Sequence, residues 1–239
     1  MDIIYSLAIV AFAALIHASF QLSVSVLTLL SGHAIGAKKK RSKILRLTSS
    51  YIAGAGVMTL LLLSFTSLMF IHLFNSDDLL MVWTIISGIA LGIGVAVWLF
   101  YYRKGRKDST ELWIPRAFAK HLVSRSKVTK DSAESFSLGL TSVISEIIFI
   151  IPSIAVSALV LINLPPHWQV IGIILYTIVS LLSLLIVWSI IGRGKPIGRI
   201  QKWRVENKRF LQFAAGSALI TLGFFIYVSE IMTAMSGAI

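Results

Sequence analysis

The sequence predicts an all-α integral membrane protein with six transmembrane helices. Its composition is the first indication, because 56% of its 239 residues are hydrophobic and only 13% are charged, about half the charged fraction of a typical soluble domain. The mean hydropathy of +0.86 is correspondingly high. Length is the second indication, since a helix needs about 20 consecutive apolar residues to cross a bilayer and the chain offers that length repeatedly. The placement of the charges is the third.

The first three predicted spans occupy about 3–30, 47–74 and 79–102. The first span follows Asp2 and ends before a basic segment, and the second span follows that segment. A polar turn, NSDDLL (75–80), ends the second span and precedes the third. The third span continues to Arg103, where the next basic segment begins.

The last three predicted spans occupy about 135–163, 167–191 and 210–235. The turn NLPPHW (163–168) separates the fourth span from the fifth, and a basic segment separates the fifth from the sixth. No loop is long enough to form a separate soluble domain. We therefore expect a single transmembrane domain over 1–239, divided into repeat one (about 1–102), a cytoplasmic loop (about 103–134) and repeat two (about 135–239).

The basic residues are segregated along the chain. All 22 lysines and arginines lie in three loops, which hold six, nine and seven of them in chain order. With six spans these loops share one side of the membrane, which the positive-inside rule places in the cytoplasm. Both termini are then outside, in a multi-pass protein of the cell (inner or plasma) membrane. We expect the net charge of +12 to contact anionic lipid headgroups rather than nucleic acid, mainly at Lys38, Lys39, Lys40 and Arg41.

Several kinds of chemistry are excluded by what the sequence lacks. The chain has no cysteine, which excludes disulfides, thiolate metal sites and thiol redox chemistry. It also contains no G-x-S-x-G elbow, no H-E-x-x-H, no P-loop and no dinucleotide fingerprint. We therefore expect no enzyme activity, no cofactor and no metal site.

The two halves of the chain share a plan. Each begins with a long span that has polar residues at mid-depth, and two plainer spans follow. Because three is odd, the second half must be inverted relative to the first, an arrangement that recurs in secondary transporters around a site near the bilayer midplane. The alternative is that any six-span protein divides into two threes. We also expect close helix packing at small residues of spans two, three and six, namely Gly54, Gly56, Gly88, Gly92, Gly216 and Gly223.

The first span of each half carries the candidate site. LIHASFQLSVSVLTLLSG (15–32) places His17 and Gln21 four residues apart and so on one helix face. LGLTSVISEIIFIIPSIAVSALV (138–160) carries a carboxylate, Glu146, whose burial in lipid costs about 2.5 kcal/mol or more. Such residues mark substrate or ion paths by default. The predicted substrate or coupling-ion residues are Glu146, His17, Gln21, Ser142, Ser145 and Pro152.

A purely structural role is the competing interpretation of these residues. In the functional interpretation Glu146 faces the inside of the bundle and pairs with His17 or a nearby hydroxyl. In the structural one, a neutral Glu146, hydrogen-bonded to a serine and followed by a proline kink, would lock helix packing without any transport. Pro152 cannot donate to the carbonyl of Ile148, which is left free for a neighbour, a water or an ion.

These segments resemble the lysine-exporter (LysE) superfamily, which includes the membrane domain of the DsbD/CcdA thiol-electron carriers and small cation exporters. The resemblance rests on the polar breaks of spans one and four, on FSLGLTSVISEIIFIIPS (136–153), and on the basic segments GAKKKRSKILRLTSSYIAGAG (36–56) and RIQKWRVENKRFLQFAAGSALITLGFF (199–225). It implies outside termini and a three-plus-three inverted fold. The carriers' Pro-Cys pairs are replaced by His17-Ala18-Ser19 and Pro152-Ser153, so thiol-electron transfer is excluded. The acidic pairs and histidine-rich loops of several cation exporters are also missing.

The leading functional interpretation is a small secondary transporter that exports a small solute or cation by alternating access, with Glu146 as the coupling site. The alternative is a non-transporting membrane scaffold or accessory subunit of a larger complex. Besides lipid, the expected partners are the small solute or cation and either a second copy of the chain or another membrane protein.

Overall fold

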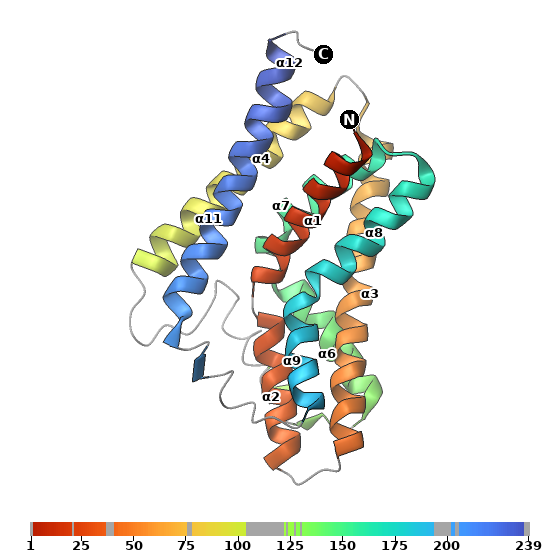
Figure 1. Cartoon of the computed structure of the whole chain (residues 1–239), viewed down its shortest axis with the longest axis vertical. Coiled ribbons are helices and arrows are strands. Elements are labelled where there is room, and N and C mark those ends of the chain that lie inside the picture. Colours follow the sequence, from red (N-terminus) through yellow and green to blue (C-terminus); the bar gives the residue numbers. More distant parts are fainter. Residues whose placement is uncertain are drawn as a thin grey trace.

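The computed structural model describes residues 2–20, 22–36, 41–75, 78–103, 122, 124–126, 128–129, 131–193, 202–203 and 206–236 (Figure 1). These residues form helices and turns, with no strand among them. The main elements, in chain order, are α1 (Ile3–Ser19), α2 (Leu22–Gly36), α3 (Arg41–Leu73), α4 (Leu79–Ala96), the π-helix η2 (Val97–Arg103), α6 (Ser132–Ser145), α7 (Ile147–Ile162), α8 (Pro166–Ser180), α9 (Leu182–Gly192), α11 (Lys208–Ile226), the π-helix η3 (Tyr227–Met232) and α12 (Thr233–Met235).

Three segments are long and apolar enough to cross a membrane unbroken, and they are Arg41–Leu73, Leu79–Phe100 and Arg209–Met235. Up to three more spans result if each of three bent helix pairs counts as one span: α1 with α2, α6 with α7, and α8 with α9. The prediction of an all-helical protein with several membrane spans is therefore confirmed for the described residues. Helices α2 and α3 continue beyond the predicted span ends at 30 and 47, as far as Gly36 and Arg41.

Local sequence signals fix several helix starts. The carboxylate of Asp2 accepts a hydrogen bond from the backbone N–H of Ile4 (3.4 Å) at the start of α1. The carboxylate of Asp131 accepts one from the N–H of Glu134 (2.8 Å) at the start of α6. Both side chains satisfy backbone donors that a first helical turn leaves unpaired. At the start of α8, Pro166 occupies the first turn, where its missing N–H costs nothing.

The closest helix contact joins α3 to α6. A Cβ atom added to Gly54 would lie 2.1 Å from the carbonyl oxygen of Phe136, and one added to Gly139 would lie 2.1 Å from that of Tyr51. The two backbones therefore touch directly, as small residues allow in membrane helices. The hydroxyl of Ser135 donates to the carbonyl of Leu47 (2.6 Å) across the same contact.

A second close contact joins α4 to α11. A Cβ atom on Gly94 would lie 2.9 Å from the carbonyl oxygen of Gly216, and Ser87 donates to the carbonyl of Gly223 (2.8 Å). By contrast, a Cβ atom on Gly88 or Gly92 would meet no described atom within 4 Å. The expectation that these last two glycines pack against a helix is therefore wrong within the described part of the chain. Both lie on exposed faces of α4, and the contact uses a neighbouring face instead.

The remaining helices surround α1 and α7. Helix α1 packs against α7 and α8, α2 packs against α3 and α9, and α3 also packs along α7. The α4–α11 pair joins this group through contacts of α11 with α1 and of α4 with α7. The two chain ends lie at the same end of the molecule, whereas α2 ends and α3 begins at the opposite end (Figure 1). Arg41, at the start of α3, donates a hydrogen bond to the carbonyl of Gly192 at the end of α9.

Candidate functional site

Three helix breaks interrupt the bent pairs. Residues Ile3–Ser19 and Val24–Gly32 differ in direction by 48°, α6 and α7 by 81°, and α8 and α9 by 54°. At a break, the last carbonyls of one helix and the first N–H groups of the next lose their partners within the helix. Irregular backbone at membrane depth is tolerated where protein surrounds it or where it lines an aqueous cavity. Breaks of this kind form the substrate and ion sites of many transporters.

Direct contacts bring the three breaks together. The ring of Phe20, which follows the last residue of α1, stacks on the ring of Phe149 in the first turn of α7, with centroids 5.3 Å apart. The hydroxyl of Ser183, in the first turn of α9, donates to the carbonyl of Ala18 (2.8 Å). This bond occupies one of the carbonyls freed at the end of α1. The three bent helix pairs therefore meet where each of them is interrupted.

Glu146 is the residue at the break between α6 and α7. Its backbone N–H donates to the carbonyl of Val143 (3.0 Å), and its carbonyl accepts from the N–H groups of Phe149 (2.9 Å) and Ile150 (3.2 Å). The residue is 3% exposed. A single residue thus ends one helix and begins the next, so Glu146 stands both at the C-terminal end of α6 and at the N-terminal end of α7.

His17 is paired with a residue that the sequence did not single out. Its Nδ1 lies 3.0 Å from the phenolic oxygen of Tyr176 on α8, and the tautomer of the imidazole decides which of the two donates. Both side chains are buried. Tyr176 is a polar residue in the middle of the fifth predicted span, which is the signal that could have identified it. The structure thus links α1 to α8 through a buried polar pair.

The other predicted site residues have mainly local contacts. The hydroxyl of Ser142 donates to the carbonyl of Gly139 (2.7 Å), and that of Ser145 donates to the carbonyl of Ser142. Pro152 is buried within α7, which continues through it. Gln21 lies outside the described residues, as do Lys38, Lys39 and Lys40 of the predicted lipid-binding group.

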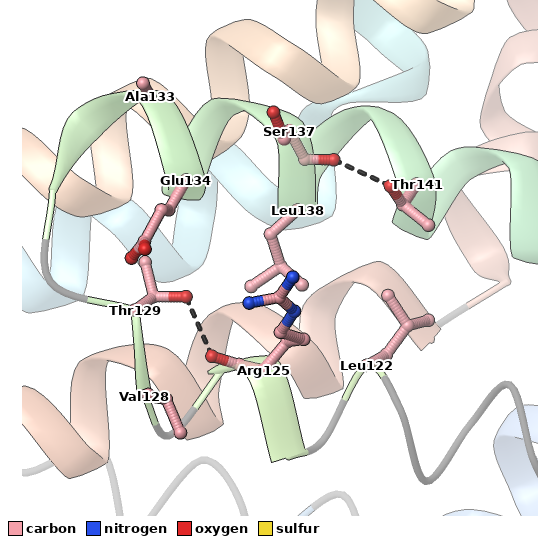
Figure 2. A pocket seen from close by; sticks show the side chains of 9 residues that line it. All are labelled: Leu122, Arg125, Val128, Thr129, Ala133, Glu134, Ser137, Leu138 and Thr141. Carbon is pink, nitrogen blue, oxygen red and sulfur yellow. Dashed lines mark hydrogen bonds between the residues drawn. The ribbon is translucent and has the colours of Figure 1, made fainter.

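A pocket of about 440 Å³ lies at the end of α6 remote from Glu146 (Figure 2). It lies between α6 and the segment around 122–129, and it is lined by Leu122, Arg125, Val128, Thr129, Ala133, Glu134, Ser137, Leu138 and Thr141. The pocket is therefore lined by one basic side chain, one acidic side chain and several hydroxyl groups, together with aliphatic side chains. Ser137, Thr141 and Ser145 follow one another at four-residue spacing, which places them along one face of α6. This hydroxyl stripe runs from the pocket to the break.

No cluster of three or more His, Asp or Glu side chains suited to a metal ion occurs in the part of the chain that the structure describes. Comparisons with protein-family models, with curated proteins and with solved structures found no match. The site therefore has to be interpreted from its own geometry.

Proposed function

We propose that the protein is a small secondary transporter, an exporter of a small solute or cation, with Glu146 as the coupling site. The observation that carries the proposal is a buried carboxylate at an 81° break between two apolar helices. Intramembrane acids are costly and occur mainly on substrate, ion or proton paths. A break leaves backbone groups available to a ligand at the same place.

The six-span count, the orientation and the inverted repeat belong to the same proposal. The helix contacts support it. If spans one, two and three are replaced by spans four, five and six, and the reverse, most pairs of contacting helices are again pairs that contact each other. The contact of α3 with α6 and α7 corresponds to that of α8 and α9 with α1 and α2. The α4–α11 contact joins spans three and six, and the exchange only swaps these two partners, so the contact is unchanged. A LysE-like fold, with repeats related by an axis in the membrane plane, would have this pattern.

One departure from that symmetry suggests which state is present. Among the described residues, α11 packs on α1 and α4 packs on α7. Helices α1 and α7 are the halves of the two bent pairs that lie on the side of the molecule where both chain termini are found (Figure 1), which we call the terminus side. Within the described ranges, no packing of similar extent joins the α4–α11 pair to α2 or α6. We infer that the terminus side is closed and that rocking of the α4–α11 pair would exchange one set of contacts for the other. This is the motion that alternating access requires.

The pocket supplies an entrance on the opposite side. Arg125 and Glu134 give it groups of both signs, and the hydroxyl stripe of α6 leads from it toward Glu146. In the proposed orientation the pocket faces the cytoplasm, as export requires. A solute would enter there, and the ionisation of Glu146 would couple its passage to a proton or a cation.

The test uses purified protein in sealed vesicles that contain a pH-sensitive dye. Inorganic cations and amino acids are added one at a time, and the luminal pH is followed. At least one solute should change the luminal pH with the wild type but not with Glu146→Gln, which keeps the shape of the side chain and removes its charge. Glu230→Gln is the matched control, since Glu230 lies near the terminus-side end of the last helix and is only half-buried. Equal responses from wild type and Glu146→Gln would contradict the coupling role.

The scaffold interpretation makes the opposite prediction. If no solute in the panel changes the luminal pH, and the protein co-purifies from its membrane with a stoichiometric partner, the carboxylate at the break serves helix packing. The transporter proposal then fails.

A further inference from the structure

Most hydroxyl groups within these helices donate to a carbonyl of their own helix one turn back. Thr66 donates to Leu62 (2.7 Å) and Thr177 donates to Ile173 (2.8 Å) in this way. Such back-bonding satisfies a hydroxyl without any help from neighbouring helices. A serine or threonine that does not use it therefore stands out.

Two serines of α7 are exceptions. Ser153 and Ser157 are completely buried, and their hydroxyls have no hydrogen-bond partner among the described residues. On α3, which packs along α7, the hydroxyl of Thr59 is in the same condition. Buried polar groups are nearly always paired, with protein or with water. Three completely buried hydroxyls on two adjacent helices therefore indicate a partner other than the described residues.

Their positions on α7 are regular. Ser153 and Ser157 are four residues apart and so lie on one helix face. At about 1.5 Å per residue they lie about 10 Å and about 16 Å beyond Glu146 along the helix, in the direction of the terminus side. They thus lie on the far side of the break from the hydroxyl stripe of α6.

The chemistry of this face selects the occupant. Helix α7 carries no charged side chain, and its remaining residues are aliphatic, aromatic or Pro152. Hydroxyl groups alone can hydrogen-bond a chain of waters, but they cannot neutralise a desolvated ion. Water, which needs two to four polar partners in a buried site, fits hydroxyls on two helices that pack together.

We propose that Ser153 and Ser157, with Thr59, line a hydrated seam that extends from Glu146 toward the terminus side, which the packing of α11 on α1 and of α4 on α7 closes to the solute. The seam is the outer half of a polar path whose inner half is the pocket and the α6 stripe. Its use for proton supply rests on the proposed function, whereas its hydration does not.

Thiol accessibility tests the seam, and the natural absence of cysteine gives a background without reaction. Ser153→Cys and Ser157→Cys are nearly isosteric, and each is treated in lipid nanodiscs with a small cationic methanethiosulfonate, which reacts with thiols that water reaches. Ala158→Cys is the matched control for a buried position on the same helix, and Ile151→Cys for an outward-facing one. Both serine positions should react at least tenfold faster than both controls. Rates equal to that of Ala158→Cys would overturn the proposal.

Alanine variants give a second readout if the cysteine variants do not fold. In a dry core Ser153→Ala removes an unpaired hydroxyl and should raise the melting temperature, whereas in a hydrated seam it removes bonds to water and should lower it. A rise in melting temperature for both Ser153→Ala and Ser157→Ala would overturn the seam. Neither measurement uses a solute, so the seam and the transporter proposal can fail independently.

Discussion

Phe20 and Phe149 stack with their ring centroids 5.3 Å apart and their planes 21° apart, and each residue lies beside a break in its own span. Phe20 comes from the first half of the chain and Phe149 from the second. Both are buried. The stack therefore holds the two interrupted spans at one level, which is the level of Glu146.

Phe149→Ala should lower the free energy of unfolding by about 3 kcal/mol, since it removes a buried aromatic ring together with its stacking partner. The measurement is thermal unfolding in detergent, followed by the loss of monodisperse protein. Phe65→Ala is the control, because Phe65 is 66% exposed on the outside of α3, and it should leave the melting temperature nearly unchanged. Equal changes in melting temperature for the two variants would show that the stacked rings do not stabilise the fold.

Tyr176→Phe should cost less, about 1 kcal/mol, because hydrogen bonds between membrane helices contribute about 0.6 kcal/mol on average and at most about 1.7. The ring and its contact with His17 remain, and only the hydroxyl is lost. In the vesicle assay we expect the same variant to reduce flux, since α8 is held to the first break through this pair. Tyr5→Phe, at an exposed position of α1, is the control. Unchanged flux in Tyr176→Phe would limit the pair to a structural role.

Gly139→Ala should prevent normal assembly, because the new methyl group would lie 2.1 Å from the backbone oxygen of Tyr51 and α3 would have to move. Gly88→Ala is the matched control on a helix of the same bundle, since the added methyl group meets open space. It should be neutral or raise stability by up to about 1 kcal/mol through helix propensity. Size-exclusion profiles of fluorescent fusions compare the two directly. A normal profile for Gly139→Ala would contradict the direct backbone contact.

Topology can be tested with single cysteines in the cysteine-free chain. Cysteines placed beside Met1 and Ile239 should react with an impermeant maleimide in intact cells, and one at Lys39 should react only after the cells are opened. Reaction at Lys39 in intact cells, with the termini protected, would reverse the orientation that the basic loops predict.

Hydropathy was sufficient to predict an all-helical protein with several helices able to cross a membrane, because the length and apolar character of such a helix are properties of one segment. The positions of the helix breaks could not be predicted from the sequence in the same way. Pro152 is the strongest helix-breaking signal in span four, yet α7 runs through it and the bend occurs at Glu146. The break at Leu181 lies in SLLS (180–183), which contains no glycine, proline or charge. It is accompanied by the bond from Ser183 to Ala18, a contact between distant segments that no local pattern encodes.

The same distinction between local and long-range information applies to the candidate site. An acid in an apolar segment is conspicuous by itself, so Glu146 could be named from the sequence, and the structure does place it at a break. Tyr176 could not be matched to His17, because their pairing depends on how two helices cross. The open faces at Gly88 and Gly92 show the converse, since small residues permit a close contact without requiring one.

The direct backbone contact of α3 with α6 also bears on how the chain is made. Both close contacts join the two halves, α3 with α6 and α4 with α11, rather than neighbours within one half. When the ribosome has delivered only the chain up to the end of η2, the glycine face of α3 has no partner and the surface of α4 that will receive α11 is bare. Neither close contact can form until the second half of the chain has been made, so the bundle is completed only after α11 has been synthesised.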